Sequence, residues 1–225
     1  MIAPLRNYAI TGFLWYQGES NTDHPDNDRT LFQELIAQWR KDWRLGDLPF
    51  FYVQLANFMA SPMKTQESKW AKLRDEQRLP LSTPNTAMVV TIDVGEANDL
   101  HPQNKKAVGN RLALCAERLV YRQNVIHQGP LFKEMKVQDA TVELSFDSVG
   151  GGLVAKGGPL QGFELCGEDR EFHRAVAEII DERVRVSSER VKNPIGVRYA
   201  WADDPAEANL FNKEGLPASP FEAYQ

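Results

Sequence analysis

"AITGFLWYQGESN", residues 9–21, joins a nearly continuous apolar run to a cluster of short polar side chains. An apolar run of this length predicts a strand that is covered on both faces, as in a parallel sheet. The polar residues that follow, with Gly18 among them, predict a turn at the carboxyl end of that strand. Two further buried strands are expected at 49–56 and 86–93, from their continuous apolar and β-branched residues.

Helical patterns separate and follow these strands. The first, at 31–46, places a set of large apolar side chains at helical spacing: Leu31, Leu35, Ile36, Trp39 and Trp43. Gly46 is the expected C-cap of this helix. Further helices are expected at 67–79 and at 105–121. Strands that alternate with helices predict a parallel α/β sheet, here over residues 1–125.

The pattern changes after about residue 126. Residues 126–225 contain short alternating runs between Gly, Asp and Ser turns, which predict a small β-rich lobe. The stretch at 171–184 has a composition that also suits a helix. We expect strands there, because the stretch lies between two β-type runs.

Composition narrows the classes of function. The net charge is −5 and no basic stripe is visible, so we expect no nucleic-acid partner. No apolar run approaches the roughly 20 residues of a membrane span. The two cysteines, Cys115 and Cys166, are too few and too far apart for a disulfide scaffold or a Cys-rich zinc site. The chain enters a buried strand almost at once, without a signal-peptide pattern, which would suit a Met1 internal to a longer protein.

Two polar clusters, at 17–21 and 93–101, follow predicted strands and are therefore expected at the same edge of the sheet. His101 follows Asp99 by two residues, and an acid beside a histidine can orient the ring and stabilise its charged form. The alternative is that Asp99 caps the next helix. The remaining histidines are read as surface or structural residues: His24, His127 and His173.

A nucleophile is less easily assigned from the residues alone. Ser20 directly follows a strand beside a glycine, but the chain has no G-x-S-x-G turn. A metal site would need several ligands at fixed spacing, and no such motif is present. We expect no functional metal, although these residues could gather at one edge: Glu19, Asp23, His24, Asp93, Glu96, Asp99 and His101.

Several longer motifs in the sequence resemble those of a known protein family. They are "GFLWYQGESN", "PFFYVQLA", "LRDEQ", "DVGEANDLHP", "NKKAVGNRLAL" and the terminal "VRYAWADDPAEANLFNKEGLPASPF". Over nearly its whole length the chain resembles the sialate O-acetylesterase family of SGNH-type, GDSL-like hydrolases. The resemblance implies part of a three-layer α/β/α parallel-sheet domain followed by a β-rich lobe. It also implies removal of O-acetyl groups from sialic acid or related sugars through a serine acyl-enzyme, without a cofactor.

The resemblance also implies roles for particular residues. The family's nucleophilic serine lies in an earlier G-Q-S-N segment that is absent from this chain, so Ser20 is not the nucleophile. His101 is the implied general base. The implied oxyanion and substrate-binding residues are Gln17, Gly18, Glu19 and Asn21.

The acid that supports the histidine departs from the family pattern, because the position three residues before His101 is Asn98. Many SGNH hydrolases carry an acid there. Asp99 is our choice for the third triad member, and Glu96 or no acid at all are the alternatives.

The expected partners are an acetylated sugar and the missing N-terminal half of the same enzyme, with a homo-oligomer possible. A secreted or periplasmic location is expected from the resemblance. The rival hypothesis is a truncated copy that binds carbohydrate without turnover, with "YAWADDP" and three aromatic residues lining a sugar site: Phe163, Phe211 and Phe221. The commoner role for such aromatics is in the core, and an in-frame G-Q-S-N segment upstream of Met1 would favour the esterase.

Overall fold

The predicted apolar runs form a parallel sheet. The computed structural model describes residues 2–60 and 66–225. Within these residues the sheet contains three strands in the order β1 (Phe13–Trp15), β2 (Phe50–Val53) and β3 (Thr86–Val89). Trp15 pairs with Tyr52 and Tyr52 with Met88, so the strands are in register. Their carboxyl ends therefore lie at one edge, and the loops that start there are close in space.

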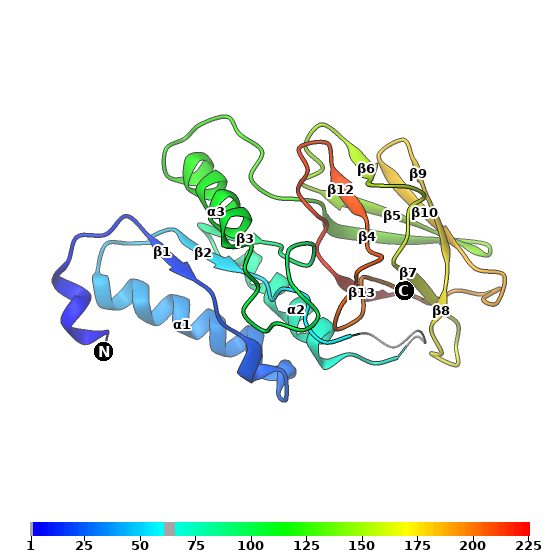
Figure 1. Ribbon diagram of the computed structural model, residues 1–225, viewed down its shortest axis with the longest axis horizontal. Coiled ribbons are helices and arrows are strands. Elements are labelled where there is room, and N and C mark those ends of the chain that lie inside the picture. The colour runs from blue at the N-terminus through cyan, green and yellow to red at the C-terminus, as the bar shows by residue number, and fades with distance from the viewer. Residues whose placement is uncertain (1, 61–65) are drawn as a thin grey trace.

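Helices cover both faces of this sheet, as Figure 1 shows for α1 (Asp28–Trp43) and α3 (Lys105–Leu119). The alternation of side chains along β2 explains the arrangement. Phe50 and Tyr52 belong to the hydrophobic cluster that includes residues of α1. Phe51 and Val53 belong to the cluster that includes residues of α3. The continuous apolar pattern of these strands is thus explained by burial on both sides.

The remaining helix, α2 (Lys69–Arg78), begins with a side-chain cap, because Ser68 accepts a hydrogen bond from the backbone N–H of Ala71. Short 3-10 helices complete the half of the molecule that contains the sheet: η1 (Ala3–Asn7), η2 (Glu19–Asn21), η3 (Pro25–Asn27) and η4 (Leu79–Ser82). No helix in the described ranges is long and apolar enough to cross a membrane.

Two details of α1 differ from the sequence predictions. The prediction of Gly46 as the C-cap is wrong, because Arg44 already takes the left-handed conformation that ends the helix, with φ 56°. Gly46 lies in the following turn. Leu31 was expected on the buried face but is 65% exposed, because it lies at the rim of a small cavity rather than beneath the sheet.

The second half of the chain consists mainly of β-strands, and we call it the lobe. Its sheets are antiparallel, in the orders β4-β5-β10-β9, β13-β11-β7-β8 and β12-β6. The stretch at 171–184 contributes to three of these strands, which confirms the prediction of strands. The strands are β4 (Leu131–Gln138), β5 (Thr141–Asp147), β6 (Leu153–Ala155), β7 (Phe163–Cys166), β8 (His173–Arg174), β9 (Val176–Ile180), β10 (Arg183–Ser187), β11 (Gly196–Tyr199), β12 (Leu210–Asn212) and β13 (Phe221–Tyr224).

A buried arginine ties the lobe to the α/β half. Arg74 of α2 is fully buried and donates to the carbonyl oxygens of Leu55 and Ala56 on one side. On the other side it donates to those of Ala202 and Asp203, at 2.7 and 2.8 Å. Burial lowers the pKa of Arg74 to about 9, and the nearby Asp203 opposes that fall. These bonds fix the 202–203 loop of the lobe against the end of β2.

Candidate active site

The turn after β1 requires a glycine. Gly18 has φ 156° and ψ −17°, and a Cβ at this position would lie 2.7 Å from Nε2 of Gln77. Gln77 is itself held, because its Oε1 accepts from the backbone N–H of Leu55 at 2.9 Å. Its Nε2 donates to the carbonyl oxygen of Gln17 at 3.4 Å. Gly18 thus allows the backbone to turn against α2 and positions Gln17 at the end of β1.

The Gln17 side chain is oriented by a short relay of hydrogen bonds. Nε2 of Gln17 donates to Oδ1 of Asn21 at 3.3 Å, and Nδ2 of Asn21 donates to Oδ1 of Asp28 at 2.6 Å. Asp28 is buried at the start of α1. Burial raises the pKa of the Asp28 carboxyl above its ordinary value, and the hydrogen bond from Asn21 partly opposes that rise. The relay leaves the second N–H of the Gln17 amide for another acceptor.

A small cavity of about 80 Å³ lies beside this relay, lined by Gln17, Asn21 and Asp28 among others. Tyr52 also lines it, and its buried hydroxyl makes no hydrogen bond within the described part of the chain. Burial raises the pKa of this hydroxyl well above its ordinary value. The cavity is therefore polar on one side and is bounded by α1 on the other.

Glu19 and Ser20 lie in η2, directly after the glycine. Oε2 of Glu19 accepts the backbone N–H of Gly18 at 3.0 Å. Use of that N–H in an oxyanion hole therefore requires the Glu19 side chain to move. Ser20 is exposed, and its hydroxyl makes no hydrogen bond to any described residue. The motif is thus a turn in which the side chains of Gln17, Glu19 and Asn21 each make a hydrogen bond.

His101 lies in the loop that begins at the carboxyl end of β3 and leads to α3. The ring is exposed and makes no hydrogen bond among the described residues. Oδ1 of Asp99 accepts the backbone N–H of His101 at 2.8 Å. Oε1 of Glu96 accepts from Gln103 at 3.0 Å. Neither acid contacts the imidazole here, and Asn104, not Asp99, caps α3.

Two contacts that the sequence did not suggest hold this loop. Arg111 of α3 forms a bidentate pair with Asp93 at 2.7 and 2.6 Å and also donates to the carbonyl of Val90. Farther along, Oδ1 of Asn57 accepts the backbone N–H of Gly95 at 2.8 Å. Asp93 is therefore engaged with an arginine. Among the described residues, no group of three or more His, Cys, Asp or Glu is placed to hold a metal ion.

The three aromatic residues considered for a sugar site are core residues. Phe211 and Phe221 are 4% and 0% exposed, and Phe163 is 2% exposed. Phe221 stacks on Phe132 with ring centroids 4.4 Å apart. The commoner role predicted for these aromatics, burial in the core, is confirmed. Trp201 and the acids of "YAWADDP" line a large cavity, and the buried Phe163 contributes to its wall.

The loops that carry Gln17, Glu19 and His101 thus begin at one edge of a parallel α/β sheet, and an antiparallel lobe follows this unit in the chain. The family model described as "carbohydrate esterase, sialic acid-specific acetylesterase" matches residues 2–117, and the chain belongs to this family. A carbohydrate acetylesterase from Xanthomonas citri has a similar structure, with a TM-score of 0.93 and 42% identity. That match covers 98% of this chain and 52% of the other.

Curated relatives agree with the family. The sialate O-acetylesterase of Mus musculus is 31% identical over 249 residues, covering 98% of this chain and 46% of the relative. The sialate O-acetylesterase of Rattus norvegicus is 30% identical, covering 99% of this chain and 46% of the relative. The chain thus spans about half the length of these relatives. The resemblance stated from the sequence motifs is confirmed at the level of the family.

Proposed function

We propose that the protein removes O-acetyl groups from sialic acid or a related acetylated sugar through a serine acyl-enzyme. The observation that carries this proposal is the common sheet edge at which the loops of Gln17 and His101 begin, within a chain of the esterase family. We assign the α/β half to an SGNH-type three-layer domain that is only partly contained in this chain.

In the proposed reaction a serine oxygen attacks the acetyl carbonyl carbon while its proton passes to Nε2 or Nδ1 of His101. The tetrahedral intermediate expels the sugar oxygen, which takes that proton. Water then gives a proton to His101 and attacks the acyl carbonyl carbon, and the serine oxygen leaves with that proton as acetate is released. The free N–H of the Gln17 amide stabilises the oxyanion, a contribution of about 3–4 kcal/mol for one donor. Asp99 accepts the backbone N–H of His101 in the structure, and the support of the ring that we propose for Asp99 would require a rotation of either side chain.

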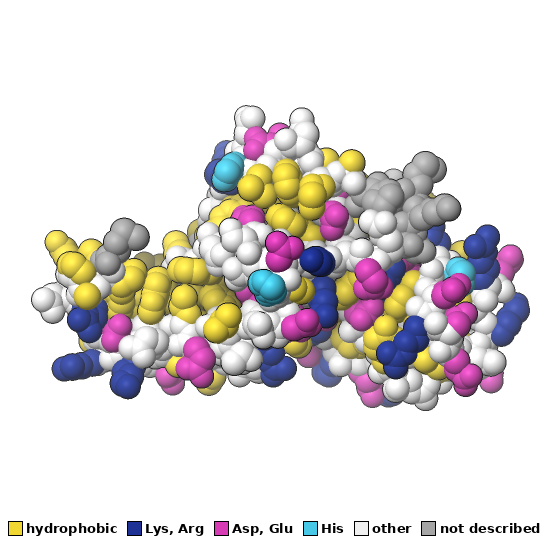
Figure 2. Space-filling view, turned by 90° about the horizontal axis from the view of Figure 1, so that it is seen from below, with side chains coloured by type: hydrophobic (Ala, Val, Ile, Leu, Met, Phe, Trp, Pro, Cys, Tyr) yellow, Lys and Arg dark blue, Asp and Glu magenta, His cyan; other side chains and the backbone are white. Residues whose placement is uncertain are grey.

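We place the nucleophile outside these 225 residues, in a segment that packs against β1. β1 pairs with β2 on one side and with no described strand on the other. Large apolar side chains are exposed on β1 and on the segment that precedes it: Leu5, Tyr8 and Leu14. Figure 2 shows hydrophobic side chains gathered at the end that carries the N-terminus. An open strand edge beside apolar surface is typical of an interface.

The proposal is tested by paired substitutions in the full-length product of the gene. His101→Ala should lower kcat on p-nitrophenyl acetate and on O-acetylated sialic acid by at least about a hundredfold, since it removes the general base. Ser20→Ala should keep most of the activity. His24→Ala, which changes an exposed histidine in another loop, is the matched control. Near-complete loss in a folded Ser20→Ala variant would instead make Ser20 the nucleophile.

The alternative is a copy that binds carbohydrate without hydrolysing it. It is favoured by one observation, namely that no described serine makes a hydrogen bond to the His101 ring. An in-frame G-Q-S-N segment upstream of Met1 would support the esterase, and its absence would support the alternative. The expected secreted or periplasmic location and the possible homo-oligomer stay predictions.

A further inference from the structure

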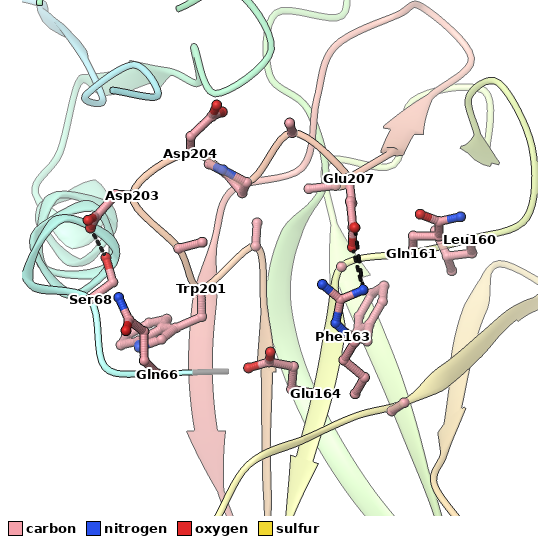
Figure 3. A pocket seen from close by; sticks show the side chains of 18 of the residues that line it. Gln66, Ser68, Leu160, Gln161, Phe163, Glu164, Trp201, Asp203, Asp204 and Glu207 are labelled. Carbon is pink, nitrogen blue, oxygen red and sulfur yellow. Dashed lines mark hydrogen bonds and ion pairs between the residues drawn. The ribbon is translucent and has the colours of Figure 1, made fainter. Parts of the chain in front are cut away.

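A cavity of about 810 Å³ lies where the lobe meets the amino-terminal end of α2. Its size falls within the range of about 300–1,000 Å³ that is usual for small-molecule sites. The walls come from Ser68, from the 160–164 segment and from the 200–208 loop of the lobe, as Figure 3 shows. None of the residues that we assign to ester chemistry lines it, so it is a separate site.

The described lining is acidic. Its carboxylates are Glu164, Asp203, Asp204 and Glu207, and its guanidinium is Arg174. Arg174 pairs with Glu207 at 3.1 Å, and buried Arg198 pairs with Glu164. Asp203 accepts from Ser68 at 2.5 Å. A carboxylate has room for further donors after one such bond, so the walls offer acceptors to hydroxyl groups.

A second feature points to a ligand independently of the acids. Trp201 lines the cavity and is 8% exposed. Its buried indole N–H makes no hydrogen bond to any described residue. A buried donor without a partner costs free energy. This nitrogen is closed to solvent in the structure, so a turn of the Trp201 ring is needed before an acceptor on a bound molecule can recover that free energy. The cavity therefore combines acceptors, an unused donor and aromatic surface, the groups that bind polyhydroxylated rings.

The cavity is linked to the loop of His101 through a short segment after β2. Nδ2 of Asn57 donates to Asp204 at 2.8 Å, while Oδ1 of the same residue accepts from Gly95. Two residues on, the backbone N–H of Met59 donates to the carbonyl of Ala97 at 2.8 Å. The segment 57–59 thus contacts both the cavity wall and the His101 loop, so the two are neighbours in the fold.

We infer that this cavity binds the uncharged glycan part of an acetylated carbohydrate while an acetyl group lies at His101. The inference rests on the proposed function and names its substrate class. Neutral sugar hydroxyls can donate to the carboxylates and accept from Trp201. The carboxylate of a sialic acid would meet more like than opposite charge in this cavity, which disfavours it there.

The test measures binding by calorimetry, with the full-length gene product and unacetylated probes. The neutral probes are xylotetraose, cellotetraose and mannotetraose, and the anionic probe is 3′-sialyllactose. We expect at least one neutral tetrasaccharide to bind about tenfold more tightly than sialyllactose. Trp201→Phe, which keeps the ring and removes the donor, should weaken that binding about fivefold, the value of one hydrogen bond.

Charge is tested separately. Glu207→Lys should shift the preference toward sialyllactose, whereas Glu189→Lys, at an exposed position outside the cavity lining, should not. If Trp201→Phe fails to fold, the comparison of Glu207→Lys with Glu189→Lys tests the inference, because both positions are exposed. The inference is overturned if no neutral tetrasaccharide binds, if sialyllactose binds as well as the neutral probes, or if neither cavity variant changes binding.

Hydrolysis of p-nitrophenyl acetate, measured on the same samples, separates this inference from the proposed function. The small ester needs His101 but not the cavity. Hydrolysis without tetrasaccharide binding would reject the cavity alone. Binding without hydrolysis would reject the esterase proposal and leave a carbohydrate-binding cavity.

Discussion

Asn21 donates its side-chain N–H to the buried carboxylate of Asp28 at 2.6 Å. An ionised carboxylate only accepts hydrogen bonds, so this contact fixes which end of the Asn21 amide faces α1. The carbonyl end of Asn21 must then face Gln17, whose amide can only donate to it. Asp28 therefore determines, through Asn21, the direction of the Gln17 donor that we assign to the oxyanion.

The first prediction concerns Asn21. Asn21→Asp removes the donor and places two carboxylates at hydrogen-bonding distance, which should displace Gln17. We expect kcat on acetyl esters to fall about 10- to 100-fold with little change in KM, because the lost interaction is made mainly in the transition state. Steady-state kinetics of the full-length protein measure this. Asn110→Asp, the same change at an exposed site on α3, is the control, and an unchanged kcat in Asn21→Asp would refute the relay.

The second prediction concerns the pH dependence of stability. Burial raises the folded-state pKa of Asp28, so the folded protein binds this proton more tightly than the unfolded chain does. The stability from this group is present below the unfolded pKa of about 3.9 and is lost as pH rises through the folded pKa. Asp28→Asn does not titrate. The free energy of unfolding of Asp28→Asn, relative to the native protein, should therefore increase between about pH 4 and pH 7.

Denaturant unfolding at several pH values measures that difference. Asp139→Asn changes a carboxylate in an exposed turn of the lobe and is the matched control. The free energy of unfolding of Asp139→Asn, relative to the native protein, should vary much less with pH, because a hydrated carboxylate meets similar surroundings in the folded and unfolded states. A difference for Asp28→Asn that is flat with pH would contradict the burial of an ionised group in the relay.

The third prediction concerns Gly18. Gly18→Ala places a methyl group against Gln77 at a positive φ, and Gln77 cannot retreat without breaking its bonds to Leu55 and Gln17. We expect a loss of about 1–3 kcal/mol in the free energy of unfolding. Gly109→Ala in α3 meets no atom within 4 Å and should instead stabilise the protein by about 0.5–1 kcal/mol. Equal effects of the two substitutions would show that the turn is not constrained.

The sequence predicted the elements better than the contacts between them. β2 and α3 were predictable because burial on both faces and the spacing of Val108 and Cys115 are properties of one segment. The roles of Asn57 and Arg74 could not be predicted from the sequence. Each joins segments that are far apart in the chain, and their polar side chains resemble surface residues until the fold is known.

The same distinction applies to the candidate site. The sequence did predict that the loops of Gln17 and His101 begin at one sheet edge, because each follows an apolar strand. The ion pair between Asp93 and Arg111 and the burial of Asp28 could not be predicted from the sequence, since both depend on a helix that packs against the sheet. The position of Asp99 beside the His101 backbone is a further contact that spacing alone did not specify.

The last prediction concerns residues 1–225 on their own. Leu14 of β1 is 64% exposed and Tyr8 is 68% exposed, and no described strand pairs with the outer edge of β1. An edge of this kind pairs readily with another chain. We therefore expect the isolated chain to dimerise or aggregate, or to bind a separately supplied segment that contains the G-Q-S-N serine. Leu14→Lys should reduce self-association, as measured by light scattering, whereas Val176→Lys, at an exposed site of the lobe, should not.

We also expect the isolated chain to show no hydrolysis of p-nitrophenyl acetate or O-acetylated sialic acid above background. His101 and Gln17 can move a proton and stabilise an oxyanion, but without a nucleophile they provide no route to an acyl-enzyme. Addition of the serine-bearing segment should restore hydrolysis, and it should do so less well for Leu14→Lys if that segment packs against β1. A purified, monomeric chain of residues 1–225 that turns over either ester would overturn this account, and Ser20 would then be the leading nucleophile.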